Sequence, residues 1–90
     1  MTVQEIHEYL SVHRDEMVED IKTLIKVDSA RAEALPGKPY GEGAAEALLA
    51  GLSLFEKHGF LGKNWDNYAI DTVINGKELG LDILAHLDVV

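Results

Sequence analysis

The sequence has 90 residues, with eight Lys and Arg against sixteen Asp and Glu, and no cysteine. A chain of this length forms one small domain at most, and its apolar content of 47% is typical of a protein that folds. The net charge of −8 leaves no basic patch to neutralise phosphates, which excludes nucleic acid and anionic membranes as partners. Without cysteine there is no disulfide framework, and any metal must bind His, Asp or Glu.

The N-terminal residues MTVQEIHEYL lack the basic and apolar regions of a secretory signal. No apolar run approaches the roughly 18 residues that a membrane-spanning helix needs. We therefore predict a cytoplasmic protein.

The first predicted element is an amphipathic helix over residues 3–26. Apolar side chains recur there at spacings of three, four or seven, and Met17 is assigned to the core. Thr2 and Glu5 have the spacing of a capping box at its start. Residues 31–43 follow as a loop with both prolines and three of the eight glycines. The loop lacks the spacing of a phosphate-binding loop, so we predict a structural turn.

A second helix is predicted from Glu42 or Gly43 to His58, ended by Gly59. Residues 63–74 then alternate with a period of two and are rich in strand formers, which predicts a β-strand. Trp65 in this strand is interpreted as an anchor for helix packing rather than a substrate platform.

Asn75-Gly76 is a hairpin-turn signal, and residues 79–90 are predicted to form a second strand that is covered on both faces. The predicted fold class is α/β, with two helices followed by a β-hairpin. Apolar Val89 and Val90 directly after a buried strand are typical of a chain that continues, so we expect that Val90 is not a natural terminus.

His86-Leu87-Asp88 lies at the end of this second strand. Residues i and i+2 of a strand point to the same face, so the imidazole and the carboxylate would project together. A histidine can bind a metal while a neighbouring carboxylate fixes its ring. The same spacing occurs by chance in a chain of this composition, so the motif alone leaves a structural role open.

The other histidines are weaker candidates. His13-Arg14-Asp15 has the same spacing but falls in the first predicted helix, where residues two apart point in different directions. We interpret it as a solvated helix surface. His7 and His58 are isolated on predicted helices and are assigned to the surface or to local packing.

An ordered series of short segments extends over nearly the whole chain. It begins with Arg14-Asp15-Glu16 and Leu24-Ile25-Lys26-Val27-Asp28-Ser29. It continues with Pro39-Tyr40-Gly41-Glu42-Gly43, Ala47-Leu48-Leu49, His58-Gly59-Phe60, Lys63-Asn64-Trp65-Asp66-Asn67-Tyr68-Ala69, Leu79-Gly80 and Leu84-Ala85-His86-Leu87-Asp88-Val89-Val90. This series resembles the N-terminal part of the PepV-like dipeptidases, in the aminoacylase, carnosinase and carboxypeptidase G group of zinc exopeptidases.

The resemblance implies a fold, a reaction and two site residues. The chain would be the N-terminal part of a three-layer helix/sheet/helix catalytic domain, with residues 1–90 lacking the lid or dimerisation domain. The complete enzyme would hydrolyse short peptides with a two-zinc site and a metal-bound hydroxide. His86 would be a zinc ligand, and Asp88 would be the active-site carboxylate that orients it.

Two positions depart from the family pattern. Ala85 replaces the glycine usual before the histidine, and Ile70 stands where a glycine often follows the Tyr-Ala pair. The family's bridging aspartate, its Glu-Glu pair and its later metal ligands follow the histidine motif and are not among these 90 residues. The resemblance thus implies that this chain is a portion of a zinc dipeptidase and that the portion is inactive by itself.

A second reading is a non-catalytic acidic α/β module. The predicted strand over residues 79–90 has an open edge, which could pair with a protein partner or with another copy of the chain. Self-association through this edge is therefore an alternative to catalysis.

Overall fold

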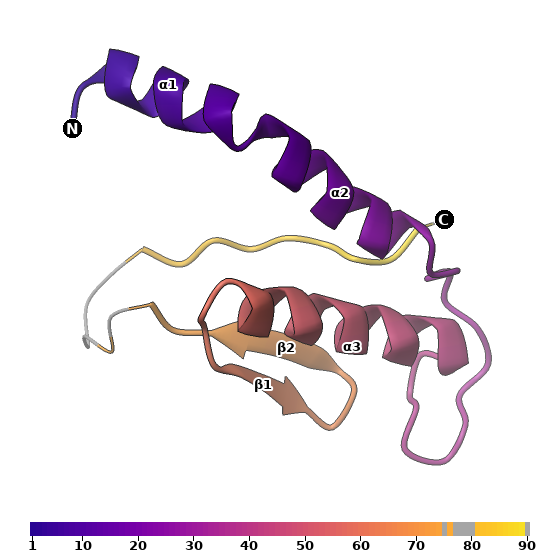
Figure 1. Cartoon of the computed structure of the whole chain (residues 1–90). Helices are drawn as coiled ribbons and strands as arrows, with labels where there is room; N and C mark the ends of the chain where they lie inside the picture. Colours follow the sequence, from indigo (N-terminus) through magenta and orange to yellow (C-terminus); the bar gives the residue numbers. More distant parts are fainter. Residues whose placement is uncertain (75, 77–80, 90) are drawn as a thin grey trace.

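The computed structural model describes residues 1–74, 76 and 81–89, and it has an α/β fold as predicted. The elements in chain order are α1 (Val3–Val12), α2 (Arg14–Ile25), α3 (Glu42–Lys57), β1 (Gly62–Trp65) and β2 (Ala69–Thr72). Helix α3 lies against the β1–β2 hairpin, while α1 and α2 form an arm on the other side of α3 (Figure 1). In the described part of the chain, no helix has both the length and the apolar composition needed to cross a membrane.

The arm is two helices rather than the single predicted helix over residues 3–26. The capping box is confirmed, because the Thr2 hydroxyl accepts from the Glu5 N–H at 3.1 Å and the Glu5 carboxylate accepts from the Thr2 N–H at 3.2 Å. His13 leaves helical geometry, with φ −96° and ψ 7°. Asp15 and Glu16 lie in the first turn of α2, where carboxylates stabilise the positive end of a helix dipole and favour a new helix start.

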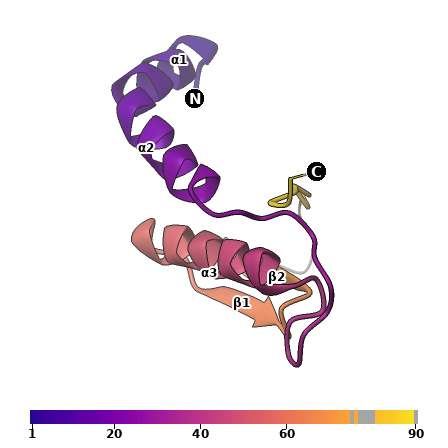
Figure 2. The same ribbon diagram turned by 90° about the vertical axis from the view of Figure 1, so that its right-hand side faces the viewer.

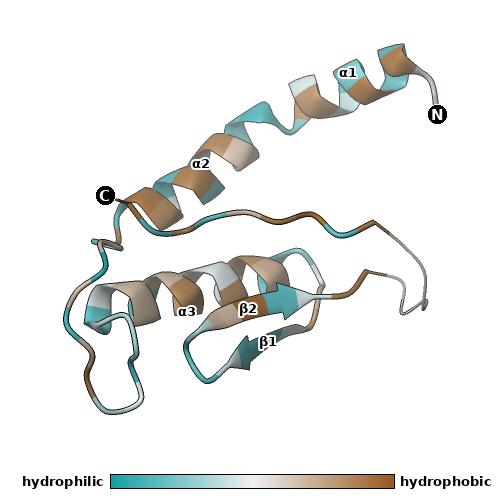
Figure 3. Ribbon diagram, turned by 180° about the vertical axis from the view of Figure 1, so that it is seen from behind, coloured by the Kyte–Doolittle hydropathy of each residue, from teal (hydrophilic) through white to brown (hydrophobic). Residues whose placement is uncertain are grey.

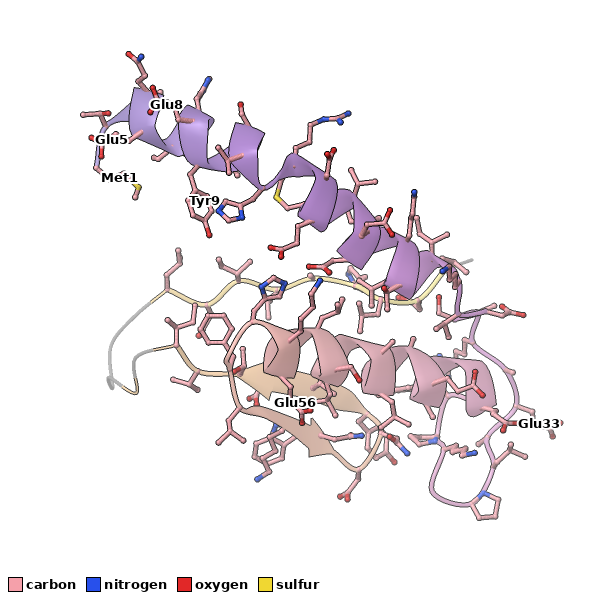
Figure 4. All side chains as sticks on the ribbon, in the orientation of Figure 1. Met1, Glu5, Glu8, Tyr9, Glu33 and Glu56 are labelled. Carbon is pink, nitrogen blue, oxygen red and sulfur yellow. The ribbon has the colours of Figure 1, made fainter. Side chains whose placement is uncertain are left out.

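No residue of α1 or α2 is buried. Met17, predicted to be core, is exposed, because among the described helices and strands α2 contacts only α1 and α3, and α1 contacts only α2. Viewed from the side, α1 extends away from the body of the molecule (Figure 2). Tyr9 lies on the side of α1 that faces the body, with its ring 4.2 Å from that of His13 (Figure 4).

Helix α3 carries the small core, and its predicted bounds agree with the structure. Ala45, Ala47 and Gly51 are buried on it, and Gly59 directly after its C-cap has a positive φ of 84°. The helix packs closely on the sheet, because a Cβ placed on Gly62 would lie 2.6 Å from Leu52 Cδ2. The preceding loop forms a turn as predicted, with Leu35 and Lys38 exchanging backbone hydrogen bonds of 3.0 and 2.9 Å.

The prediction of one strand over residues 63–74 is wrong, because the chain reverses inside that range. Asp66 and Asn67 have positive φ values of 54° and 61°, the combination of a type I′ turn. The two short strands pair antiparallel with Gly62 opposite Thr72 and Trp65 opposite Ala69. Asn and Asp tolerate left-handed backbone better than other side chains, which explains why the turn forms here.

Trp65 does not anchor helix α3, contrary to the prediction. It belongs to the exposed face of β1, is 49% exposed, and has the Lys63 ammonium 3.6 Å from its ring centroid. The hairpin turn predicted at Asn75-Gly76 includes Asn75, which lies outside the described residues, whereas Gly76 has a positive φ of 65°.

Residues 81–89, called the C-terminal segment below, lie beside α3 as an irregular stretch without strand pairing (Figures 1 and 3). The strand predicted over residues 79–90 also includes residues 79, 80 and 90, which lie outside the described part. The prediction of coverage on both faces is wrong for this segment, because Ile83 is 83% exposed and Leu84 is 93% exposed. No described neighbour covers these side chains, and only Leu87 is partly buried.

Candidate functional site

The two site residues predicted from the sequence lie side by side on the C-terminal segment. Between them, Leu87 packs against α3, where a Cβ placed on Gly51 would lie 3.2 Å from Leu87 Cδ1. In an extended chain the residues on either side of an inward side chain project outward together. His86 Nδ1 accordingly lies 3.7 Å from Asp88 Oδ1. This distance permits an electrostatic interaction but is longer than a hydrogen bond.

The pair is accessible from solvent, since the side chain of His86 is 94% exposed. An imidazole nitrogen and a carboxylate oxygen are both donors that zinc accepts. Among residues 1–74, 76 and 81–89, however, no three His, Asp or Glu side chains come together as a metal-binding group. The described chain thus brings together one histidine and one carboxylate, fewer than the roughly three protein ligands that a catalytic zinc takes.

The second His-x-Asp motif does not form a comparable pair. His13 Nδ1 lies 3.8 Å from Glu16 Oε1, one turn further along the helix, while Asp15 Oδ1 lies 3.8 Å from Arg14. The ring of His13 also contacts Tyr9. These neighbours are those of a helix surface, in agreement with the interpretation from the sequence.

The structure reveals a polar cluster that the sequence did not predict. Asp20 of α2 interacts with both residues at the end of α3: Lys57 Nζ donates to Oδ1 at 2.5 Å, and His58 Nε2 lies 2.6 Å from Oδ2. The Asp20 side chain is only 17% exposed. His58 therefore packs against Asp20, which agrees with the prediction of either a surface position or local packing for this histidine. The partners are separated by 37 and 38 positions in the sequence, which explains why no local pattern indicated the contact.

The cluster shifts the protonation of its members. The hydrogen bond from Lys57, and next the one with His58, holds the pKa of Asp20 below its usual 3.8. The same bond to Asp20 raises the pKa of Lys57 above its usual 10.5. Both shifts favour the charged forms, so the cluster acts as an electrostatic clasp between the arm and α3.

A shallow hollow lies next to the clasp. It is lined by Asp20 and His58 together with side chains from α3, its following turn and the end of β2, namely Leu54, Phe55, Phe60, Thr72 and Ile74. His86 is not part of its lining. The hollow and the predicted metal-binding pair are therefore separate features.

Among curated proteins, the chain is similar to a Bacillus subtilis (strain 168) protein named Putative dipeptidase YtjP. The two are 34% identical over 79 residues, which is 86% of this chain but 17% of the Bacillus protein. The chain thus spans about a sixth of the length of that relative. No family model and no solved structure matches the chain.

Proposed function

We propose that this chain is the N-terminal part of the catalytic domain of a zinc-dependent, cytoplasmic dipeptidase, and that it is inactive by itself. The similarity to a protein named as a dipeptidase, over 86% of the chain, carries this proposal. It is supported by the adjacent His86 and Asp88 side chains, which are of the residue types that a zinc hydrolase needs. Short peptides are the proposed substrates of the complete enzyme.

His86 would be a metal ligand, and Asp88 would hold its ring. Asp88 lies beside Nδ1, so the carboxylate favours the tautomer with the proton on that nitrogen. Nε2 is then the nitrogen with a lone pair for a metal. Bound zinc would supply Lewis-acid polarisation of a peptide carbonyl and lower the pKa of a water.

The incomplete set of ligands explains the proposed inactivity of the chain alone. A catalytic zinc takes about three protein ligands, and the described residues contain no group of three. The remaining ligands and the groups that select a peptide would lie in a longer polypeptide. The Bacillus relative, of which the chain covers 17%, has the length for them.

Zinc titration of the chain, followed by NMR of its histidine rings, tests the ligand assignment. We expect His86 to respond at lower zinc concentration than His7, His13 or His58, and binding to weaken severalfold in Asp88→Asn. The matched control is Asp15→Asn, which alters a carboxylate in the other His-x-Asp motif. An equal response of all four histidines would contradict the assignment.

A chimera tests the enzymatic function. The segment of the Bacillus relative that matches this chain is replaced by the corresponding residues of this chain, and hydrolysis of a dipeptide panel is measured with zinc. We expect hydrolysis by the chimera, loss of at least about a hundredfold on His86→Ala, and little change on His7→Ala. A chimera that hydrolyses dipeptides equally well with His86→Ala would overturn the proposed role of His86.

A further inference from the structure

Gly51 lies at a crowded point in the middle of α3, where two other parts of the chain meet the helix. It is buried, and alanine at this position would favour the helix more than glycine does. A Cβ placed on Gly51 would lie 2.7 Å from Ile70 Cδ1 and 3.2 Å from Leu87 Cδ1. Because a side chain here would overlap both neighbours, the glycine provides the space in which they pack.

Leu87 connects this point to the candidate site. It is the one partly buried side chain among residues 81–89. Within the described part of the chain, neither a hydrogen bond nor an ion pair joins these residues to another element. Packing of Leu87 beside Gly51 is therefore the contact that holds the C-terminal segment on α3. His86 and Asp88 are bonded to Leu87 on either side, so a shift of its backbone moves both of them.

The other neighbour of Gly51 belongs to a strand whose backbone is firmly held. Ile70 pairs with Asn64 in the β1–β2 ladder, and the Thr72 hydroxyl donates to the Leu61 carbonyl oxygen at 2.8 Å. The end of the Ile70 side chain can rotate, but its strand cannot move aside without breaking these bonds. Packed interiors transmit added volume to the part that is held least. A side chain at position 51 would therefore displace Leu87 rather than β2.

We propose that Gly51 is a positioning residue, which sets the place of His86 and Asp88 through Leu87. The proposal rests on the proposed function, because it concerns the placing of a metal ligand. A contact of 3.2 Å requires the neighbour to give by a few tenths of an ångström, and a functional constellation tolerates errors of only about 0.5 Å. The contact lies within the chain itself, so it would act in the complete enzyme as well.

NMR of the ring nitrogens in the zinc-free chain tests this role. With the ring neutral, Asp88 beside Nδ1 favours the tautomer of His86 that carries its proton there, and Asp88→Asn gives the reference for loss of this preference. We expect Gly51→Ala to shift the tautomer ratio towards that reference. The matched control is Ser53→Ala, which places the same alanine at an exposed position of α3 and should leave the ratio unchanged. No metal is involved, so positioning is measured separately from ligand binding.

A second substitution tests whether the effect passes through this contact. Ile70→Val removes Cδ1, the atom nearest to the new methyl group. Gly51→Ala should raise severalfold the zinc concentration at which His86 responds, and the double variant with Ile70→Val should restore both this concentration and the tautomer ratio. Circular dichroism should show an intact α3 in each variant.

The outcomes separate the two proposals. A tautomer ratio that is unchanged in Gly51→Ala, or changed equally in Ser53→Ala, would overturn the positioning role. A ratio that shifts and is restored as expected, in a chain whose zinc does not select His86, would support the positioning role and contradict the ligand assignment.

Discussion

Asp20 makes the polar contacts that attach the arm to the end of α3. It is the acceptor for Lys57 and the partner of His58, and both are more than thirty residues away in sequence. Asp20→Asn should lower the thermal midpoint of unfolding, because the amide cannot replace the charge that both partners face. Asp15→Asn is the matched control: its side chain is almost fully exposed and contacts no other element, so the loss of its charge near the start of α2 should change the midpoint far less.

The pH dependence of this stabilisation follows from the depressed pKa of Asp20. A carboxyl whose pKa is lower in the folded state stabilises the protein above its unfolded value, here 3.8. That contribution is lost as the pH falls through the lower folded pKa. The difference in midpoint between the natural chain and Asp20→Asn should therefore be largest near neutral pH and shrink below pH 3.8. A difference that stays constant well below pH 3.8 would contradict the clasp.

At the scale of elements, the loop before α3 passes so close to the first turn of that helix that Gly43 must be a glycine. A Cβ on Gly43 would overlap the carbonyl oxygen of Asp28, and a backbone atom cannot move aside easily. Although alanine favours helix over glycine by about 1 kcal/mol, Gly43→Ala should lower the free energy of unfolding by about 1–3 kcal/mol. Urea unfolding measures this value, with the exposed Glu46→Ala as the control in the same helix.

Prediction from the sequence succeeded where a local pattern determines the structure. Helix α3 combines strong helix formers with Gly59 after its end, so both its type and its bounds were predictable. The closeness of His86 and Asp88 follows from the two-residue period of extended chain. The hairpin was misplaced because the turn residues Asp66 and Asn67 fit the same alternation as a continuous strand.

Long-range packing explains the remaining errors. Asp20 and His58 carry no mutual signal in the sequence, since their contact depends on how α2 lies on α3. The apolar residues of the arm predict burial, but burial requires a neighbouring element, and among the described helices and strands only α3 contacts the arm. Met17 is exposed for this reason. A periodic apolar pattern thus indicates which face of an element tends to be buried, but it does not identify the element that buries it.

At the scale of the whole molecule, the chain is expanded. Its radius of gyration is 15.2 Å, against about 12 Å for a compact domain of this length. The cause is visible in Figure 2, where the arm extends away from the α3–hairpin body. A chain with this shape buries less surface on folding than a compact one of equal mass.

The dependence of stability on urea concentration should show this deficit. The slope of that dependence, the m-value, is proportional to the area exposed on unfolding. From the accessible surface of 7646 Å², we expect an m-value about a quarter smaller than that of a compact domain of the same length. Circular dichroism of the helices and fluorescence of Trp65 would measure it. An ordinary m-value would mean that the arm folds onto the body in solution.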